Sequence, residues 1–571
     1  MLHPYNERIA LLRERMKSEG IDIYLLANSD PHQSEYLPDH WKCVEWLTGF
    51  KGEVATVCIT PTEALLWTDS RFFISGAEQL RETSVQLMKL KIDISPLQWL
   101  EQQKAAASRT LSIAGDLRVL FGPIAKFVTR NCDYINDLWR DRPDLPLNQA
   151  ELYPVEYAGE SAQSKIGRIL DATNHQPLFL SSLDDIAWTL NLRGSDIACT
   201  PVFISYLLLS DKEKVLYIDP RKLTPEVEKY LTEISVKTAP YETAPIGQYP
   251  EEPNPVPLFK AIKNDVEIKG FRAAMLKDGI ALTRFYRWLE QQLTSGKTVM
   301  EMDCVNMLIE MRRQQPLYRE ESFPAIVAWQ DHAAMPHYEN CDKTNVAICG
   351  NGLLLIDTGG QYLDGTTDIT RTIGIGQVSD AQRRDYTLVL KGHIRLAQAV
   401  FPAGTRGDQL DVLARMDLWR DGKTYLHGTS HGVGHYLGVH EGPQSVRMEH
   451  NPQALLPGMV FSNEPAIYLG GRYGIRHENC VLVRPYDVQK EAPLASPCLA
   501  EEQGQYLCLE TLTWCYIDTK PLDLSLMSDD ELRWLNHYNR QVLDTLSPHL
   551  NDDEVAWLQE KCRPVESNVH H

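Results

Sequence analysis

Four carboxylates stand within or directly after apolar, strand-like segments in the second half of this sequence. Burying a carboxylate costs several kcal/mol unless the group is paired or bound to a metal ion. Each one alone would be more typical of a turn, a helix cap or half of an ion pair. Together they indicate a metal site, whose candidate ligands are Asp357 at the end of GLLLID, Asp368 in GTTDITRT, Glu464 after MVFSN and Glu478 in GIRHENCVLV.

Two of these carboxylates flank a predicted turn. Asp357 and Asp368 lie on either side of the turn signals Gly359-Gly360 and Asp364-Gly365. A hairpin centred near residues 362 and 363 would place the two carboxylates opposite each other. They would repel each other there unless a cation lay between them.

The segment GIRHENCVLV also contains a positively charged side chain, Arg476, close in sequence to the candidate carboxylate Glu478. Strand alternation puts Arg476 and Glu478 on one face, with His477 on the other. Arg476 can then orient a carboxylate or an anionic group of a ligand.

Histidines and glycines alternate in the segment LHGTSHGVGHYLGVHEGP. Each glycine costs roughly 1 kcal/mol in a helix interior, so we predict a tight loop that lets the backbone approach a ligand. A lone histidine is usually a structural residue, but four beside acidic strands indicate an imidazole in the same site. They are His427, His431, His435 and His440.

Four carboxylates and one imidazole form an oxygen-rich, thiol-free donor set. Such a set suits manganese, cobalt or zinc ions. Two divalent cations would balance the four negative charges and leave a neutral cluster. A water bridging the two ions could lose a proton near neutral pH and become a nucleophilic hydroxide.

Prolines mark the borders of the segments that must position these residues. RDRPDLPLNQAELYP interrupts any regular pattern, and six prolines lie between residues 240 and 257. The second stretch is too rich in proline for a helix or a central strand, which predicts an extended linker. We therefore expect three domains, covering residues 1–155, 156–258 and 259–571.

The first two domains are predicted to be related. ATVCITPTEALLWTDSR (55–71) and SYLLLSDKEKVLYIDPR (205–221) align without gaps at an offset of 150 residues. Each segment predicts a strand, a polar turn, a second apolar strand and a charged exit. This similarity favours a duplicated α/β unit.

The last domain mixes helical and strand patterns. VEIKGFRAAMLKDGIALTRFYRWLEQQL has helical spacing, and Ser379 with Gln382 can form a capping box for a helix that ends near Gly404. Short β-rich runs punctuated by glycine lie between the helices, which predicts an α+β domain.

Composition excludes some classes of function. The 571 residues include 57 Lys+Arg and 77 Asp+Glu, a net charge of -20 that disfavours nucleic acid and anionic membranes as partners. No apolar run approaches the ~20 residues of a membrane span, and the amino-terminal segment is too charged for a signal peptide. We expect a cytoplasmic protein. The twelve cysteines contain no CxxC pair and predict free, mostly buried thiols.

At these residues the chain resembles the Xaa-Pro aminopeptidases (aminopeptidase P) of the pita-bread metallopeptidase family. IDTGGQYLDGTTDITRT, HGTSHGVGHYLGVHEGP, SNEPAIY and GIRHENCVLV follow the family's ligand blocks in order and spacing. The resemblance covers the whole length, including EYLPDHWKCVEWLTGFKG, YAGESAQSKIGRIL and the tail around DELRWLNHYNRQVLDTL. It implies two creatinase-like α/β domains followed by a pita-bread catalytic domain with a helical tail.

The resemblance also implies roles for individual residues. Two metal ions, most often manganese, would be held by five ligands, with Asp368 and Glu478 bridging. The implied ligands are Asp357, Asp368, His431, Glu464 and Glu478. His337, His427 and His440 would line the substrate site, Arg476 would support the cluster, and His435 has no implied role beyond structure.

The activity that the resemblance implies is removal of the amino-terminal residue from peptides with proline in second position. A metal-bridging hydroxide would attack the X-Pro bond, and Glu464 would take the proton of the water. Proline lacks an N–H, so peptidases that bind an extended strand through that group lose a contact. A prolidase acting on X-Pro dipeptides and a non-enzymatic binding protein on the same fold remain alternatives. The family also implies a homodimer formed through the amino-terminal domains.

Overall fold

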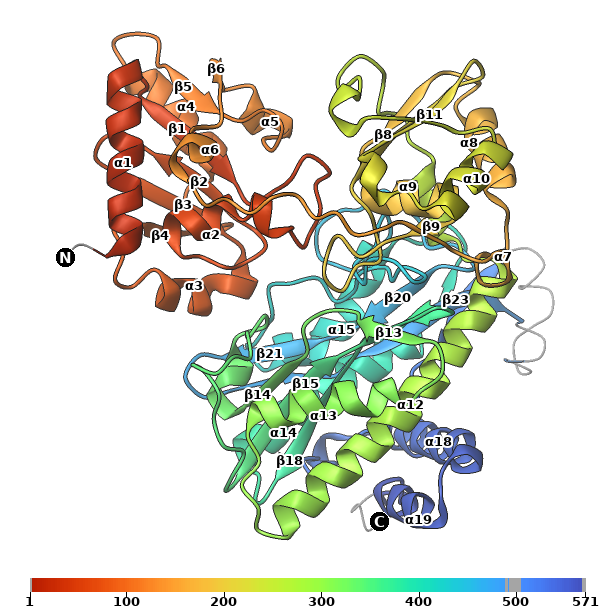
Figure 1. Cartoon of the computed structure of the whole chain (residues 1–571). Helices are drawn as coiled ribbons and strands as arrows, with labels where there is room; N and C mark the ends of the chain where they lie inside the picture. The colour runs from red at the N-terminus through yellow and green to blue at the C-terminus, as the bar shows by residue number, and fades with distance from the viewer. Residues whose placement is uncertain (1–2, 488–490, 492–504, 567–571) are drawn as a thin grey trace.

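The computed structural model describes residues 3–487, 491 and 505–566. The chain forms three bodies (Figure 1). We call residues 4–138 domain 1, residues 151–261 domain 2 and residues 265–561 domain 3.

Domain 1 is a six-stranded sheet in the order β4-β3-β2-β1-β5-β6. Alternate residues of its central strand enter two different apolar clusters, Tyr24 and Leu26 in one, Ile23 and Leu25 in the other. Because alternate side chains point to opposite faces of a strand, both faces of this sheet are covered. The elements are α1 (Pro4–Glu19), β1 (Ile23–Ala27), η1 (Asp39–Trp41), α2 (Cys43–Thr48), β2 (Thr56–Ile59), β3 (Ala64–Thr68), η2 (Ser70–Phe72), α3 (Phe73–Gln79), β4 (Gln86–Lys89), α4 (Pro96–Ala106), β5 (Ile113–Gly115), α5 (Gly122–Ala125), β6 (Arg130–Asn131) and α6 (Tyr134–Leu138).

Domain 2 has a four-stranded sheet in the order β12-β11-β10-β8 and a small pair of strands, β7 and β9. The β7 strand lies on the amino-terminal side of the boundary expected at residue 155 and pairs within domain 2. The elements are β7 (Glu151–Leu152), α7 (Val155–Ala158), α8 (Ala162–Ala172), β8 (Leu178–Leu180), α9 (Leu183–Leu190), β9 (Leu192–Arg193), β10 (Ser205–Leu209), β11 (Lys214–Ile218), η3 (Pro220–Lys222), α10 (Pro225–Glu233), β12 (Lys237–Ala239), η4 (Tyr241–Thr243) and α11 (Val256–Ala261).

The two segments that align in the sequence form the same hairpin in domains 1 and 2. Thr56 of β2 pairs with Trp67 of β3, and Ser205 of β10 pairs with Ile218 of β11, in registers related by the offset of 150 residues. Both hairpins lead into a short 3-10 helix whose first N–H groups are capped by an aspartate, Asp69 or Asp219.

The proline-rich stretch after β12 is not a free linker. It follows the surface of domain 2, where Tyr241, Ala244 and Tyr249 pack against the buried cluster around Phe179. The N–H of Phe179 also donates to the carbonyl of Pro250. The apolar residues between the prolines therefore hold the stretch on domain 2. The expectation that it contains no helix was wrong at its two ends, where the short helices η4 and α11 form.

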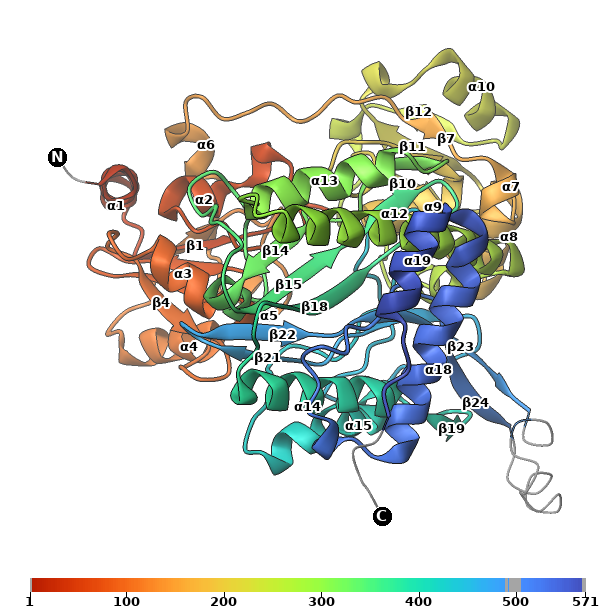
Figure 2. The ribbon, with the colours of Figure 1, turned by 90° about the horizontal axis from the view of Figure 1, so that it is seen from below.

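Domain 3 is an α+β body in which helices cover both sides of several antiparallel sheets (Figure 2). Helices α12 and α13 lie on one side, and α14 and α15 lie on the other. The elements are α12 (Asp265–Thr294), α13 (Glu301–Arg313), β13 (Tyr318–Glu321), β14 (Ile326–Trp329), η5 (Gln330–Ala334), β15 (Gly352–Thr358), β16 (Gly360–Tyr362), β17 (Gly365–Thr366), β18 (Ile369–Ile375), α14 (Asp380–Ala397), β19 (Val400–Pro402), α15 (Gly407–Arg420), β20 (Val460–Asn463), β21 (Ala466–Leu469), β22 (Tyr473–Arg476), β23 (Asn479–Tyr486), β24 (Tyr506–Thr511), η6 (Leu524–Leu526), α18 (Asp529–Leu546), η7 (Ser547–His549) and α19 (Asp552–Lys561).

The capping box predicted at Ser379 and Gln382 opens helix α14. The helix ends at Ala397, before the expected end near Gly404, because the chain turns into strand β19 and pairs with β24. No helix in the described residues is long and apolar enough to cross a membrane. The described cysteines are free and most are buried, as expected, while Cys498 lies outside the described residues.

Candidate metal centre and active site

The hairpin of β15 and β18 carries the first two candidate ligands. Its centre lies between residues 363 and 364, one residue beyond the predicted turn, so Asp357 pairs with Thr370 rather than with Asp368. Asp368 precedes β18 and lies diagonally from Asp357. The expectation that they face each other directly was therefore wrong by one register step. Because strand faces alternate every residue, the two-residue offset still leaves both carboxylates on the same side.

The other two carboxylates reach the same place from β20 and β23. Glu464 directly follows β20, and Glu478 lies between β22 and β23. The predicted strand GIRHENCVLV is thus interrupted after Arg476. The backbone N–H of Glu478 donates to the carbonyl of Thr370, and the Thr370 hydroxyl donates to Glu478 Oε2 at 2.7 Å. These two hydrogen bonds hold Glu478 against the hairpin that carries Asp357 and Asp368.

His431 joins the carboxylates from the histidine-rich loop. The N–H of Ser462 in β20 donates to the carbonyl of His431, and the N–H of Glu464 donates to the carbonyl of Thr429. Pairing with β20 places His431 Nε2 3.4 Å from Asp368 Oδ2 and 3.6 Å from Glu464 Oε1. Ligand atoms of Asp368, His431 and Glu478 all lie within 4.8 Å of one another.

The histidine-rich segment forms a loop, as predicted, although its glycines serve a different purpose. A side chain at Gly432 would meet Glu441 O at 2.6 Å, and one at Gly434 would meet Gly438 O at the same distance. The glycines therefore let the loop pack against its own backbone rather than against a ligand. His435 is buried beneath this loop, where its Nε2 donates to the carbonyl of Asp364 at 3.0 Å, consistent with the structural role expected for it.

The raised pKa values of the candidate carboxylate ligands show that this site would favour divalent cations. Burial, followed by repulsion from Asp357, raises the pKa of Asp368 well above its usual range. Burial and the charges of Asp368 and Glu464 likewise raise the pKa of Glu478. Burial, with Asp357 nearby, raises the pKa of Glu464 to about 7. Asp357 Oδ1 is buried without a hydrogen-bond partner. Acidic groups so crowded demand positive charge.

The protonation state of His431 would also allow it to bind a divalent cation. Its Nδ1 lies 2.9 Å from the carbonyl of Gly432, which can only accept, so Nδ1 carries the hydrogen. Burial, together with the charge of His440, lowers the pKa of His431 to about 3, so the ring is neutral. The lone pair of Nε2 is therefore available and points toward Asp368 and Glu464, as a metal-ligating imidazole requires.

Arg476 connects the acidic cluster to a second histidine. Its guanidinium forms an ion pair with Asp357, donates to Thr370 Oγ1 at 2.9 Å and donates to the Tyr468 hydroxyl at 2.6 Å. Tyr468 in turn lies 3.0 Å from His427 Nε2. His427 Nδ1 faces the carbonyl of Gly428, and burial and the charge of Arg476 lower its pKa to about 3. His427 is therefore neutral, and its Nε2 accepts a hydrogen bond from the Tyr468 hydroxyl.

Domain 1 contributes directly to the site through Glu35. Glu35 Oε2 lies 2.6 Å from His440 Nδ1, and the rings of His440 and His431 are in edge contact. Burial opposes charge on both partners, but their mutual attraction is stronger. It raises the pKa of His440 to about 9 and lowers that of Glu35 to about 2. His440 is thus a cation at neutral pH.

His337 also lies against domain 1. Its Nδ1 is 3.2 Å from Glu53 Oε2, and its ring packs edge-on against Phe72 at 5.2 Å. The predicted ligands Asp357, Asp368, His431, Glu464 and Glu478 line one cavity of about 1230 Å³ together with His337, His427, His440 and Arg476. The structure therefore brings every predicted site residue to a single cavity between domain 1 and domain 3.

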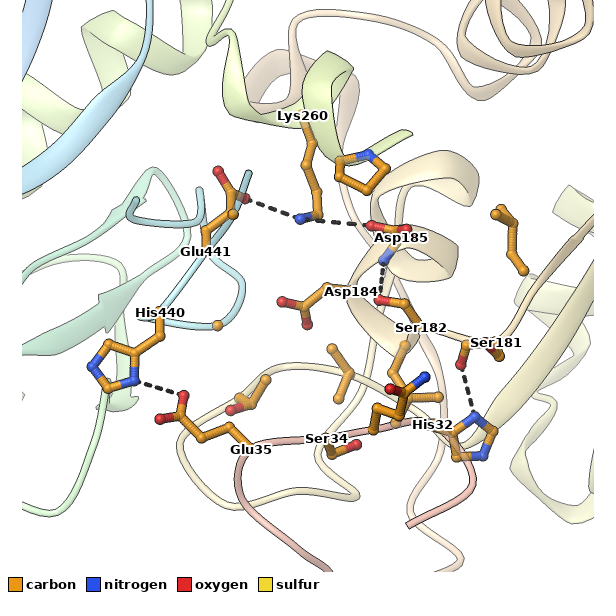
Figure 3. A pocket seen from close by; sticks show the side chains of 18 of the residues that line it. His32, Ser34, Glu35, Ser181, Ser182, Asp184, Asp185, Lys260, His440 and Glu441 are labelled. Carbon is orange, nitrogen blue, oxygen red and sulfur yellow. Dashed lines mark hydrogen bonds and ion pairs between the residues drawn. The ribbon is translucent and has the colours of Figure 1, made fainter. Parts of the chain in front are cut away.

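A second, smaller cavity of about 450 Å³ lies where the three domains meet. Glu35 and His440 line both cavities. Figure 3 shows Asp184 pointing into this cavity from α9, with Lys260 between Asp185 and Glu441 behind it. Lys260 Nζ is 3.6 Å from Asp185 Oδ1 and 3.5 Å from Glu441 Oε2. This buried network fixes the loop that follows His440.

Sequence reasoning missed the contributions of Glu35, Glu53, Arg71, Thr370 and Tyr468. Glu35 is the first residue of EYLPDHWKCVEWLTGFKG, a segment that resembles the family, and Glu53 directly follows it, but neither carried a predicted role. Arg71 coincides with Arg221 in the duplicated hairpin, yet only Arg71 lies at the cavity, with its Nη1 3.9 Å from Glu35 Oε1. Tyr468 falls inside SNEPAIY, next to a predicted ligand, and that proximity was the available signal.

Comparison with protein families defines the class of this fold and site. A model of metallopeptidase family M24 matches residues 269–485, and a model of the C-terminal region of peptidase M24 matches residues 505–565. Models of the creatinase/prolidase N-terminal domain match residues 8–119 and 141–249. The fold is that of an M24 metallopeptidase preceded by two creatinase-type domains.

Comparison with individual proteins shows which family of M24 metallopeptidases the chain resembles. A probable Xaa-Pro aminopeptidase P of Aspergillus flavus is 35% identical over 617 aligned residues, which cover 98% of this chain and 93% of the fungal protein. One from Laccaria bicolor is also 35% identical, with 98% and 93% coverage. The crystal structure of X-prolyl aminopeptidase from Caenorhabditis elegans, described as a cytosolic enzyme with a di-nuclear active site, matches with a TM-score of 0.90. It is 33% identical and covers 98% of this chain and 100% of the nematode chain. This chain belongs to the Xaa-Pro aminopeptidase P family. The fold class expected from the sequence is thereby confirmed.

Proposed function

We propose that this chain is a metal-dependent exopeptidase that removes the amino-terminal residue from peptides with proline in second position. One observation carries the proposal. Five side chains from distant segments converge beside a single large cavity in a member of the aminopeptidase P family. These side chains are Asp357, Asp368, His431, Glu464 and Glu478.

The five side chains would hold two divalent cations, with Asp368 and Glu478 shared between them. Manganese is our proposal for both ions, and cobalt or zinc would also suit, because the donor set is rich in oxygen and lacks thiolates. When bound, such ions neutralise the carboxylates, act as Lewis acids and lower the pKa of water.

Glu464 is the proposed base that takes a proton from the attacking water. Its Oε1 lies 3.6 Å from His431 Nε2 within the candidate cluster, so the carboxylate can accept a proton from a water held there. The hydroxyl of Ser462 lies 3.4 Å from Glu464 Oε1, and the backbone contact with Thr429 fixes its position. Proton transfer of this kind typically contributes about 10²–10⁴-fold to a rate.

His440 is the proposed electrophilic group. It is protonated at neutral pH because Glu35 faces its Nδ1, so its Nε2–H can donate to the oxyanion that develops from the scissile carbonyl. His427 plays a different part. Its neutral ring accepts a hydrogen bond from the Tyr468 hydroxyl, to which Arg476 also donates. It holds Tyr468 in place at the edge of the cluster.

His337 and Phe72 are proposed to contact the proline ring. Their edge-on packing forms a partly apolar wall of the cavity. Proline presents a compact apolar ring and no N–H, so a wall of this kind suits it better than a strand-like surface of hydrogen-bond acceptors.

The test is hydrolysis of an Xaa-Pro-Pro tripeptide by chelated and remetallated protein. We expect turnover only after metal is restored, and no cleavage of a matched Xaa-Ala-Pro peptide. A strong preference for Xaa-Pro dipeptides would instead identify a prolidase. The cavity of about 1230 Å³ favours longer substrates, because it exceeds the ~300–1,000 Å³ of ordinary small-ligand pockets.

We also propose a cytoplasmic location and a homodimer. The nematode relative is described as cytosolic, which supports the first proposal. The second rests on the family resemblance and is tested by light scattering on the purified chain. A molecular mass near 65.0 kDa would contradict it, because that is the mass of one chain.

A further inference from the structure

We propose that domain 1 is a hinged cover on the candidate catalytic cavity, and that the ion pairs Lys51–Glu339 and Lys91–Glu449 are the latches that determine how readily long peptides are admitted. The inference deepens the proposed function, on which its peptide-length part rests.

Domains 2 and 3 are joined by buried contacts. Leu437 of domain 3 belongs to the apolar core of domain 2. The buried guanidinium of Arg193 donates from Nε to the carbonyl of Tyr436 at 2.6 Å and from Nη2 to that of His435 at 3.2 Å. Buried apolar and charge-assisted contacts of this kind make two domains move as one body.

Domain 1 contacts domain 3 in another way. Among the described residues, no apolar cluster is built from buried side chains of both domains. In this described part of the chain, the apolar contacts are limited to Phe72, whose ring packs against His337 at 5.2 Å, and to Tyr36, which packs against the same domain 2 core as Leu437. The polar contacts between the two described domains are ion pairs: Glu35–His440, Glu53–His337, Lys51–Glu339 and Lys91–Glu449. An interface without a shared apolar core permits relative motion of its domains.

The two lysine pairs are the exposed members of this set. The side chains of Lys51 and Glu339 are 46% and 54% exposed, and those of Lys91 and Glu449 are 65% and 48% exposed. All four residues line the cavity that holds the candidate ligands. Exposed pairs are individually weak and screened by salt, so they can open and close readily.

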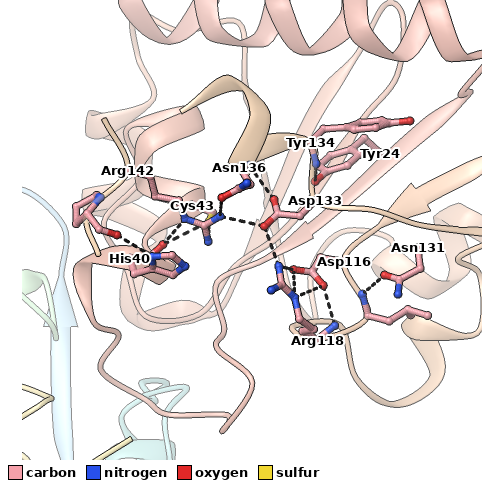
Figure 4. A network of polar contacts seen from close by, with 12 residues as sticks. Tyr24, His40, Cys43, Asp116, Arg118, Asn131, Asp133, Tyr134, Asn136 and Arg142 are labelled. Carbon is pink, nitrogen blue, oxygen red and sulfur yellow. Dashed lines mark hydrogen bonds and ion pairs between the residues drawn. The ribbon is translucent and has the colours of Figure 1, made fainter. Parts of the chain in front are cut away.

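The chain connections that would act as the hinge lie on the opposite side, between domain 1 and domain 2. One is the segment after α6. Figure 4 shows that Arg142 forms an ion pair with Asp133 of domain 1 and donates a hydrogen bond to the carbonyl of His40. At the other end, the N–H of Asn148 donates to Asp196 of domain 2 at 3.2 Å. Between these anchors, residues 143–147 have no regular structure, although the carbonyl of Pro143 accepts from His40 Nδ1 at 2.7 Å and Leu145 packs against the core of domain 2.

A second link is the loop of residues 28–37, which leaves domain 1 after β1, reaches domain 2 and returns to domain 1 at η1 (Figure 1). His32 anchors it there, with Nδ1 2.8 Å from the carbonyl of Ser181 and Nε2 2.9 Å from the Tyr241 hydroxyl. Tyr36 also packs against the core of domain 2. Glu35 lies between these anchors, so it can stay on His440 while the rest of domain 1 rotates away.

A peptide longer than the cavity must extend past the residues that line it, and the exposed latch residues are among them. Breaking both ion pairs should therefore raise the population of molecules with domain 1 rotated away by about fivefold. This factor corresponds to about 1 kcal/mol, the typical energy of two exposed pairs together. Long peptides should gain from this change, and a tripeptide should not.

The structural test uses the variant Lys51→Glu with Lys91→Glu, which places like charges at both latches. At low ionic strength we expect a larger radius of gyration by small-angle X-ray scattering and faster proteolysis between residues 143 and 147. Adding Glu339→Lys and Glu449→Lys should restore the parent profile. The matched control is Lys229→Glu with Arg540→Glu, which reverses exposed charges inside domains 2 and 3. If the variant Lys51→Glu with Lys91→Glu gives the same scattering and proteolysis as the parent, the proposal that domain 1 is a hinged cover is wrong.

The functional test compares kcat/KM for a long peptide and for a tripeptide that share the same Xaa-Pro start. The ratio of long to short should rise about fivefold in the reversed variant and return in the charge-swapped one. An unchanged ratio alongside altered scattering would overturn the role of the latches in peptide length. If the metal-loaded parent cleaves neither peptide, the proposed function fails, and scattering still decides whether domain 1 opens.

Discussion

Glu35 and His440 form an ion pair with Oε2 and Nδ1 2.6 Å apart, although they are separated by 405 residues. Glu35 belongs to domain 1 and His440 to domain 3, so the candidate site is completed by a domain far from it in sequence. The pair also explains why His440 is charged while its neighbour His431 is neutral.

Replacing Glu35 with glutamine should lower the pKa of His440. In the parent this pKa is about 9, because attraction to Glu35 outweighs the cost of burial. Without the carboxylate, burial dominates and the pKa should fall below the ordinary value of about 6.5. NMR titration of labelled histidine in zinc-loaded protein measures it, with His440→Gln to assign the signal. An unchanged pKa would show that Glu35 does not control His440.

Glu464→Gln should abolish turnover while leaving a folded protein. The amide keeps the size of the side chain but can neither accept a proton nor carry the charge. We expect a loss of at least about 10²-fold in kcat. Glu310→Gln, at an exposed position on α13, is the matched control and should keep parental activity. Parental hydrolysis of an Xaa-Pro-Pro peptide by Glu464→Gln would refute the assignment.

His427→Ala should keep bound metal yet lose activity by about 10²-fold. His427 contacts Tyr468 rather than the acidic cluster, so its removal frees that hydroxyl without deleting a ligand. Tyr468→Phe should reproduce most of the loss, because it breaks the same hydrogen bond. Metal content by mass spectrometry and steady-state kinetics measure the two effects. Loss of metal together with activity would instead make His427 part of the metal site.

Stability of the metal-free protein should fall as pH rises from about 4.5 to above 7. Glu464 has a folded pKa of about 7, raised by burial and Asp357, so the native state binds the extra proton in this range. Its contribution is complete below the unfolded pKa and is lost through the folded one, on the order of 3 kcal/mol. Denaturant titrations at pH 5 and pH 8 measure the slope.

Two comparisons isolate this effect. Glu464→Gln should show a shallower decline with pH, since it lacks the titrating group. Saturating manganese should remove most of the decline in the parent, because metal ions replace the protons. A metal-free protein that becomes more stable from pH 5 to pH 8 would contradict the crowded-carboxylate explanation.

Local patterns predicted much of this architecture. The duplicated hairpin could be predicted because strand, turn and charged exit repeat at a fixed offset, and the capping box at Ser379 fixes where α14 begins. The loop character of the histidine segment followed from its glycines. All nine predicted site residues meet at one cavity because each lies at the end of a buried strand or in the loop that pairs with β20, apart from His337, which lies beside domain 1.

Long-range pairing set the limits of prediction. The one-residue error in the hairpin centre arose because neither turn signal marks the centre itself. The turn falls at Leu363 and Asp364, and Gly365 already pairs with Tyr362. Glu35 and Glu53 could not be found, because no local pattern reports which surface of domain 1 meets domain 3. The proline-rich stretch has the composition of a linker, and the contacts of Tyr241 and Tyr249 that hold it on domain 2 are invisible in sequence.

Manganese titration of rigorously stripped protein tests the central claim most directly, with calorimetry for binding and cleavage of an Xaa-Pro-Pro peptide for activity. We predict two bound ions per chain, with activity recovered in step with their binding and both lost in Asp368→Asn. Full activity in the stripped protein, or undiminished binding of two ions by Asp368→Asn, would contradict a paired-metal centre at these residues.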